Sequence, residues 1–210
     1  MSFKKNKYVV MKQVISKEIA DFAFAYFLNR RKVARFLFDQ KFISPFEVSF
    51  GVWNDEQVPN TYSHYADTVM ETLLQKVQPL MEKYTGLKLS PTYSYARIYK
   101  KGDILARHKD RFSCEISTTL NLGGDSWPIY LDPTGKKGRA GIKVDLKPGD
   151  MLIYSGCELE HWREEFTGKD CAQVFLHYNK KGSKMAKENE FDKRPFLGLP
   201  AWFKSFKLPK

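Results

Sequence analysis

"LKPGDMLIYSGCELEH", residues 146–161, contains a turn, a short apolar run and a histidine, in that order. Pro148 and Gly149 supply the turn chemistry. Residues 151–154 form an apolar run of the length expected for a buried strand. His161 is therefore predicted to lie just past the end of a core strand, a common position for functional side chains.

Similar short runs recur from residue 89 onward, and segments rich in Gly, Asp, Pro and Lys separate them. The runs are LSPTYSYARIYK (89–100), CEISTTLNL (114–122), WPIYLD (127–132), IKVDL (142–146), DMLIYS (150–155) and CAQVFLHY (171–178). This many short strands at close spacing predict a β-sandwich or barrel.

The first part of the chain has a helical period instead. Apolar residues predict one amphipathic helix over 17–38, with Ser16 as its N-cap, and a second over about 64–84, which Gly86 ends. Residues 53–65 resemble a loop. Helical segments before an all-β part predict an α+β fold in which the helices pack on one sheet.

We therefore expect a single domain with three parts. About 1–88 forms a helical support, 89–180 forms the β core, and 181–210 is a C-terminal extension that packs on the helices or on a second copy. No apolar stretch is long enough to span a bilayer, and the amino terminus lacks the apolar segment of a secretion signal. The sequence predicts a soluble, cytoplasmic protein without a membrane partner.

The three cysteines show no CxxC spacing, so we expect free thiols rather than a disulfide framework or a structural zinc site. The net charge of +11 would suit a nucleic-acid partner, but much of the excess lies at the two ends of the chain. Basic ends are more typical of solubility than of sequence reading.

"LARHKDRFS", residues 105–113, places His108 and Asp110 two positions apart. In an extended segment such side chains leave from the same face and can converge on one ion. A third ligand must come from His64, His161 or His177. His161 is favoured, because His177 lies within the last predicted strand and His64 at a predicted helix start.

Two histidines and one carboxylate leave three positions of an octahedral ion open, the arrangement of non-haem Fe(II) oxygenases. The open positions require a co-substrate. If it is 2-oxoglutarate, its distal carboxylate needs a cation on the next strand, and Lys169 supplies one eight residues after His161. A zinc hydrolase would use the same three ligands but would leave Lys169 without a role.

Four segments together resemble the Fe(II)- and 2-oxoglutarate-dependent dioxygenases, in particular the prolyl 4-hydroxylase-like branch. They are YKKGDILARHKDR, EISTTLNL, KPGDMLIYSGCELEHWR and FTGKDCAQVFLHY, within residues 89–180. The resemblance implies a double-stranded β-helix, or jelly roll. It also implies that His108, Asp110 and His161 bind iron and that Lys169 binds the distal carboxylate of 2-oxoglutarate.

The resemblance extends to the pocket. Tyr99 matches a tyrosine that helps to hold the co-substrate, on a strand face shared with three further polar or aromatic residues, Tyr93, Tyr95 and Arg97. Where the family often has a second such tyrosine, Thr119 or Asn121 could donate instead. Phe175 replaces a tryptophan near the substrate. Arg111 and Arg163, next to metal ligands, are further candidate substrate contacts.

The resemblance implies hydroxylation of a peptidyl prolyl or other protein side chain, with consumption of O2 and release of succinate and CO2. Ascorbate is the expected reductant. Two alternatives stay open. The same fold could act on a nucleic-acid base or a free amino acid, and a non-catalytic jelly-roll module could bind ligands only. The retained ligand set and basic residue disfavour the binding module.

Overall fold

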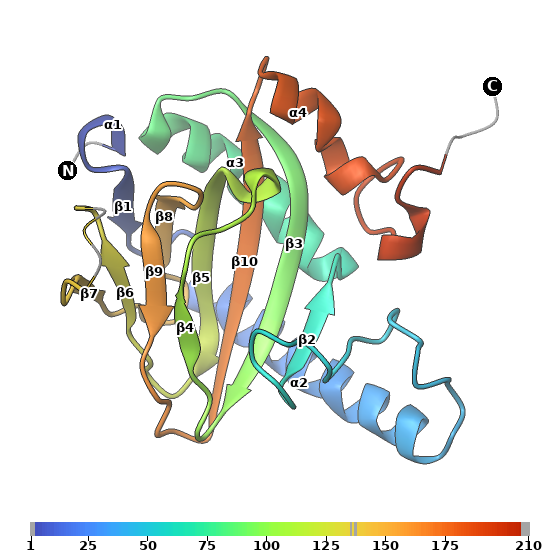
Figure 1. The fold of residues 1–210 in the computed structure, drawn as a ribbon. Helices are drawn as coiled ribbons and strands as arrows, with labels where there is room; N and C mark the ends of the chain where they lie inside the picture. The colour runs from blue at the N-terminus through green and yellow to red at the C-terminus, as the bar shows by residue number, and fades with distance from the viewer. Residues whose placement is uncertain (1–2, 135, 137, 207–210) are drawn as a thin grey trace.

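Two antiparallel sheets form the centre of the computed structural model, which describes residues 3–134, 136 and 138–206 (Figure 1). The larger sheet has the order β1-β8-β5-β10-β3-β2 and the smaller sheet β4-β9-β6-β7. The strands are β1 (Tyr8–Met11), β2 (Tyr62–Tyr65), β3 (Leu89–Lys100), β4 (Leu105–His108), β5 (Ile116–Gly124), β6 (Ile129–Asp132), β7 (Ile142–Val144), β8 (Met151–Ser155), β9 (Glu160–Arg163) and β10 (Asp170–Lys180).

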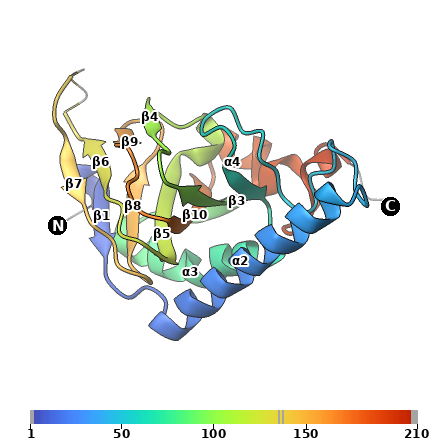
Figure 2. The same ribbon diagram turned by 90° about the horizontal axis from the view of Figure 1, so that it is seen from below.

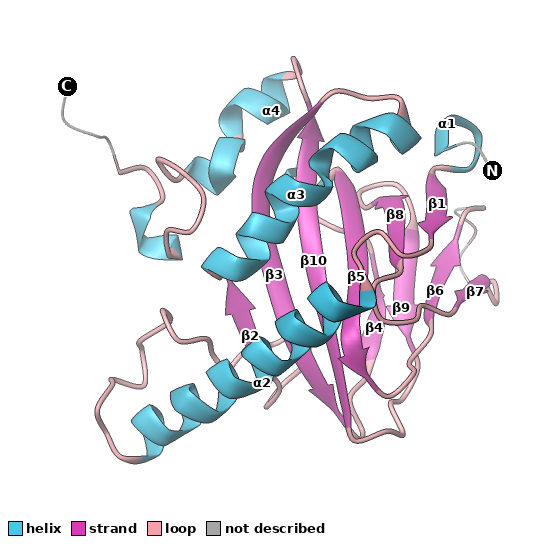
Figure 3. Cartoon of the chain, turned by 180° about the vertical axis from the view of Figure 1, so that it is seen from behind, coloured by secondary structure: helices cyan, strands magenta, loops and turns pink. Residues whose placement is uncertain are grey.

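Two helices, α2 (Lys17–Asp39) and α3 (Thr68–Thr85), cover the outer face of the larger sheet (Figure 3). The smaller sheet lies on the opposite side (Figure 2). Ser16 caps α2, since its side chain accepts a hydrogen bond from the Ile19 amide. Gly86 ends α3 in the left-handed conformation with φ 69°. Both predicted helices are confirmed, as is their position on one sheet.

The second helix begins at Thr68 and not near residue 64. Tyr62–Tyr65 pairs with β3 as an edge strand, and Asp67 is the actual N-cap, accepting from the amides of Val69 and Met70. The prediction that His64 starts a helix, and that 53–65 is a loop throughout, was therefore wrong. Strand pairing with a distant segment overrides the local helical period here.

All six predicted β runs contain strands, namely β3, β5, β6, β7, β8 and β10. The strands β1, β2, β4 and β9 were not predicted. Two of them, β1 and β2, come from the first 88 residues and form the edges of the larger sheet. The amino-terminal part is therefore not a purely helical support.

Side chains of the larger sheet alternate between two environments. Along β5, Leu120 and Leu122 belong to the apolar core under the helices. Ser117 and Thr119 leave from the other face, and β10 places His177 opposite Ser117 and Phe175 opposite Thr119. The face turned toward the smaller sheet thus carries polar and aromatic side chains, and a pocket forms there.

The C-terminal extension packs back on α3 and β3, as expected. It contains three short helices, α4 (Lys184–Glu188), η2 (Glu190–Lys193) and η3 (Ala201–Phe203). Arg194 pairs with Glu71 of α3 at 2.7 Å, and the two side chains are 0% and 2% exposed. Two other short helices are α1 (Phe3–Asn6) and η1 (Phe112–Cys114). Within the described ranges, no helix has the length and apolarity needed to cross a membrane.

Candidate metal centre

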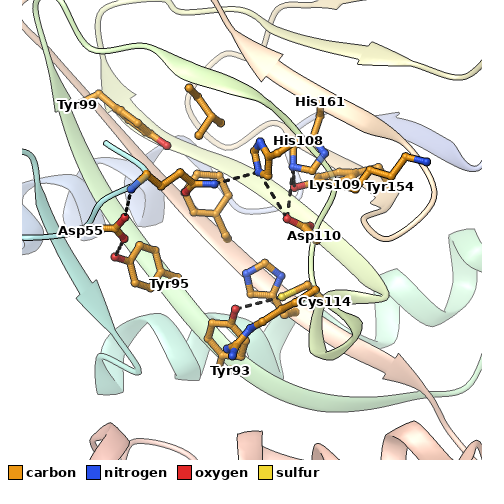
Figure 4. Close-up of a pocket in the computed structure, with 15 residues that line it drawn as sticks. Asp55, Tyr93, Tyr95, Tyr99, His108, Lys109, Asp110, Cys114, Tyr154 and His161 are labelled. Atoms are coloured by element: carbon orange, nitrogen blue, oxygen red, sulfur yellow. Dashed lines mark hydrogen bonds and ion pairs between the residues drawn. The ribbon is translucent and has the colours of Figure 1, made fainter. Parts of the chain in front are cut away.

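A pocket of about 270 Å³ opens between the two sheets (Figure 4). This volume is near the lower end for sites that bind small molecules. Its walls come from β3, β4, β8, β9, β10 and the loop before β2. Strands far apart in the sequence therefore supply one lining.

His108, Asp110 and His161 lie together in this lining (Figure 4). Strand pairing places His108, the last residue of β4, opposite His161 of β9. The Oδ1 atom of Asp110 is 3.7 Å from His108 Nε2 and 3.4 Å from His161 Nε2. One donor atom from each residue lies within 4.8 Å of the others. The three predicted ligands thus converge.

Both histidines are oriented by main-chain carbonyl groups. His108 Nδ1 lies 2.7 Å from the Ala106 carbonyl oxygen, and His161 Nδ1 lies 3.1 Å from that of Leu159. Because a carbonyl only accepts, each Nδ1 carries the proton and each Nε2 keeps its lone pair. This second contact is the one that metal-binding histidines commonly make.

The protonation of the cluster suits a divalent cation. Burial raises the pKa of Asp110, but its polar neighbours, among them the Ser117 hydroxyl, outweigh burial and lower that pKa to about 2, so the carboxylate is ionised at neutral pH. Burial and His161 lower the pKa of His108. Ligand atoms about 2.1 Å from one ion lie roughly 3.0–3.4 Å apart. The distances from Asp110 Oδ1 to the two Nε2 atoms, 3.7 and 3.4 Å, lie close to this range.

Comparison with solved structures finds the same fold at low identity. A prolyl-4-hydroxylase from Pseudomonas putida superposes with a TM-score of 0.62, 14% identity, 86% of this chain and 96% of that chain covered. The non-haem α-ketoglutarate-dependent epimerase SnoN from nogalamycin biosynthesis superposes with a TM-score of 0.60 and 13% identity, over 89% of this chain and 86% of that chain. HygX from Streptomyces hygroscopicus, with nickel, 2-oxoglutarate and hygromycin B bound, has a TM-score of 0.60 and 14% identity, over 86% of this chain and 85% of that chain.

This chain has the fold of the 2-oxoglutarate-dependent oxygenases. The jelly roll expected from the sequence is thereby confirmed. No protein-family model and no curated protein sequence matches the chain. At 13–14% identity the likeness concerns the fold, and the chemistry has to be argued from the side chains.

Next to the pocket lies a buried arginine, which packs against Trp127 together with Tyr99 of the pocket lining. Arg163, two residues after His161 on β9, is 1% exposed, and its Nη1 donates to the Trp127 carbonyl. Nη2 donates to Thr119 Oγ1 at 3.3 Å. No carboxylate of the described residues pairs with Arg163, and its Nε and the hydroxyl of Tyr99 are buried without a partner there. A buried cation in this state is stabilised by an anion.

Lys169 does not reach this place. It precedes β10 at an exposed position, its main-chain amide donates to Asp125, and its side chain does not line the pocket. The expectation that Lys169 supplies the inner cation is corrected by its position, because β10 turns inward only after it. The first inward side chain, Cys171, is uncharged and fully buried.

The other predicted residues divide between the pocket and its surroundings. Tyr99, Arg111 and Phe175 line the pocket. Thr119 contacts Arg163. The side-chain amide of Asn121 donates to the Leu146 carbonyl at 2.7 Å, in the segment before β8, and Asn121 does not line the pocket.

Residues of the loop before β2 complete the mouth of the pocket. Gln57 donates from Nε2 to His108 Nε2 at 3.0 Å, and Asp55 pairs with the buried Arg97 at 2.7 Å. Sequence analysis placed Arg97 on a polar aromatic strand face but missed Asp55 and Gln57. Their segment shows no periodicity, so no sequence signal brings it to β3.

Proposed function

We propose that this chain is an Fe(II)- and 2-oxoglutarate-dependent oxygenase. The observation that carries the proposal is the convergence of His108, Asp110 and His161 at one pocket. Behind Tyr99 of its lining lies the buried guanidinium of Arg163, which no carboxylate of the described residues neutralises. A metal site alone would suit a hydrolase as well. The buried cation of Arg163, which has no carboxylate partner among the described residues, would in addition pair with one carboxylate of a dianionic co-substrate such as 2-oxoglutarate.

His108, Asp110 and His161 would hold the iron. When bound, iron and 2-oxoglutarate supply the oxidising chemistry, in which O2 is reduced and the co-substrate yields succinate and CO2. The protein would provide two imidazoles, one carboxylate and a pocket that holds the co-substrate beside them. Ascorbate is proposed as the reductant that restores oxidised iron.

Arg163, Tyr99 and Thr119 are proposed to bind the distal carboxylate of 2-oxoglutarate. The Tyr99 ring packs edge-on against Trp127 at 4.6 Å, and the Arg163 guanidinium lies 5.0 Å from the Trp127 ring centre. These contacts fix the phenol and the guanidinium before the anion arrives. Preorganised donors of this kind lose little entropy on binding.

The substrate is proposed to be a peptidyl prolyl or another protein side chain. Tyr93, Tyr95 and Phe175 give the pocket an aromatic wall that would pack against a saturated ring or an aliphatic side chain. The likeness of fold to a prolyl-4-hydroxylase agrees with such a substrate.

A free amino acid is the second candidate substrate. Asp55 lines the pocket in front of its buried partner Arg97, and its carboxylate would suit the ammonium group of a free amino acid. The fold also accommodates compounds other than peptides, since HygX has hygromycin B bound. Matched peptides and free amino acids separate the two candidates.

The decisive experiment measures metal and co-substrate binding before any substrate is known. Calorimetric titration under anaerobic conditions should show Fe(II) binding to the wild type, followed by metal-dependent binding of 2-oxoglutarate. His161→Ala and Asp110→Ala should weaken Fe(II) binding by more than about 100-fold. Lys109→Ala, at the exposed residue between two ligands, is the control and should bind as the wild type.

Substrate is then sought by mass spectrometry and by succinate release with proline-containing peptides and with free amino acids. A mass gain of one oxygen atom, lost in His161→Ala, is the expected result. Equal Fe(II) binding by the wild type and both ligand variants would overturn the proposal.

A further inference from the structure

The second carboxylate oxygen of Asp110 is bound in a buried niche behind the candidate metal site. Oδ1 lies near both histidines, whereas Oδ2 accepts a hydrogen bond from Ser117 Oγ at 2.9 Å. Ser117 is fully buried on β5 of the larger sheet, whereas His108 and His161 belong to β4 and β9 of the smaller sheet. The carboxylate is thus held at both of its oxygens, from the two different sheets.

The direction of these hydrogen bonds follows from counting protons. Ser117 Oγ lies 2.9 Å from Asp110 Oδ2, from the Cys114 carbonyl oxygen and from His177 Nδ1. The hydroxyl has one proton to give, to an oxygen acceptor, so His177 Nδ1 must be protonated and donate to it. Burial lowers the pKa of His177 to about 4, so this imidazole is neutral near pH 7.

Gly156 gives the niche its shape. A Cβ atom at this position would lie 2.3 Å from Asp110 Oδ2 and 2.4 Å from the Cys114 carbonyl oxygen, which no real side chain could do. The Gly156 carbonyl also accepts from the Asp110 amide at 2.9 Å. The main chain after β8 therefore approaches the carboxylate closely enough to restrict its rotation.

We propose that Ser117 is a positioning residue that keeps Asp110 bound to the metal through one oxygen only. The inference rests on the proposed function. A carboxylate that rotated to present both oxygens would occupy a further coordination position. The facial arrangement of ligands leaves three positions for other groups, and the Ser117 hydrogen bond preserves all three.

The predicted consequence is a separation between metal binding and co-substrate binding. Without the hydroxyl of Ser117, Oδ2 loses its donor and is free to turn toward the ion. The metal then stays bound, while 2-oxoglutarate competes with a carboxylate oxygen for a position. A purely structural role would instead lower stability without changing this ratio.

The test uses Ser117→Ala and, as a matched control, Ser94→Ala. Ser94 is a fully buried serine of β3 whose hydroxyl has no partner among the described residues. Mn(II) is titrated by electron paramagnetic resonance, and 2-oxoglutarate is then titrated into the Mn(II)-loaded proteins by calorimetry. Urea unfolding verifies that each variant is folded. If Ser117→Ala does not fold, Ser117→Cys retains the volume with a much weaker donor.

For Ser117→Ala, Mn(II) affinity should stay within about threefold of the wild type, and 2-oxoglutarate affinity should fall at least about tenfold. Such a loss corresponds to about 1.4 kcal/mol, within the range of a hydrogen bond to a charged group. Ser94→Ala should leave both affinities unchanged. Equal 2-oxoglutarate affinities in the two variants would overturn the positioning role of Ser117 and leave the proposed function standing. A wild type without Mn(II)-dependent 2-oxoglutarate binding would overturn the proposed function and this inference with it.

Discussion

Arg163 carries a positive charge in the interior that no carboxylate of the described residues neutralises. Burial lowers the pKa of its guanidinium, because a charge is costly to remove from water. The neighbouring hydroxyl of Tyr99 is buried and unpaired as well. Two polar groups of this kind at one place indicate a ligand, and Lys169, exposed before β10, has no such environment.

Arg163→Gln should therefore weaken 2-oxoglutarate binding to the metal-loaded protein by about 30-fold or more, because truncating one partner of a buried charge pair costs about 2–5 kcal/mol. Lys169→Gln is the matched control and should change the affinity by less than about twofold. Calorimetric titration measures both. The opposite ranking of the two variants would restore Lys169 as the anchor.

Spacing in the sequence predicted the three residues that converge at the pocket, but it expected a cation there from Lys169, whose side chain is exposed and does not line the pocket. His108 and Asp110 are two positions apart on an extended segment, so their convergence follows from strand geometry. The direction of Lys169 depends on where β10 enters its sheet, which is set by pairing with β3 and β5. Arg163 lies two residues after His161, on the same face of β9. The sequence would have predicted this only if residues 160–163 had been recognised as a strand.

At the scale of elements, composition separates most of the predicted strands from the missed ones, since β6 and β7 have only four and three residues and were predicted. The runs that became β3, β5 and β10 are long and rich in β-branched and aromatic residues, so they are visible without their partners. β2, β4 and β9 have four residues each and contain histidines, arginines and other polar groups. Such strands exist because a neighbouring strand pairs with them, and pairing is not encoded locally.

The start of α3 provides a test of stability at this scale. Asp67 caps the helix, accepts from the Tyr26 hydroxyl at 2.7 Å and lies 3.3 Å from His64 Nδ1. Burial raises the pKa of Asp67, but hydrogen bonds from His64 and Tyr26 outweigh it, and the pKa is lowered. The ionised carboxylate therefore stabilises the folded state above the unfolded pKa of about 3.9.

Asp67→Asn should lower the free energy of unfolding by about 1 kcal/mol at pH 7. The difference from the wild type should shrink as the pH falls from about 4 toward 3, because the wild-type carboxylate then becomes protonated. Urea unfolding at several pH values measures it. Asp21→Asn, on the exposed face of α2, is the control and should cost less than about 0.5 kcal/mol. A difference that did not depend on pH would contradict the explanation.

At the scale of the whole molecule, the C-terminal extension is tied to the helical layer by a buried ion pair. Arg194 contacts Glu71 of α3 and also donates to the Leu199 carbonyl at 2.6 Å. Glu71 accepts from the Gly198 amide too. Two residues before Arg194, Asp192 accepts from the Tyr65 hydroxyl and pairs with Arg111 at the pocket. The extension thus connects α3, β2 and the lining of the pocket.

Arg194→Met should lower the free energy of unfolding by about 3–5 kcal/mol, because it leaves Glu71 buried without its cation. Glu71→Gln in the same background should recover part of the loss. Lys184→Met, at an exposed residue of α4, should be nearly neutral. Urea unfolding of the two single variants and the double variant gives the coupling. Strictly additive losses would show that the two side chains do not stabilise each other.

The sequence predicted that the extension packs on the helices or on a second copy, because its second half is rich in aromatic residues and prolines. It did not identify the ion pair. Arg194 and Glu71 are ordinary surface residues by type, and only their burial distinguishes them. Charge patterns along one chain do not show which two opposite charges leave water together.

The pairing of His108 with His161 has one more consequence. β4 is an edge strand that contacts β9 alone within its sheet, and its register there is irregular. A bound ion would join the two strands through their side chains, adding a cross-strand link where the register of the main-chain pairing is irregular. Amide hydrogen exchange in β4 should then slow on addition of Mn(II) and recover with a chelator, while β3 stays unchanged. The loading of the site would thereby decide how often the smaller sheet opens, and with it the access of water to the pocket.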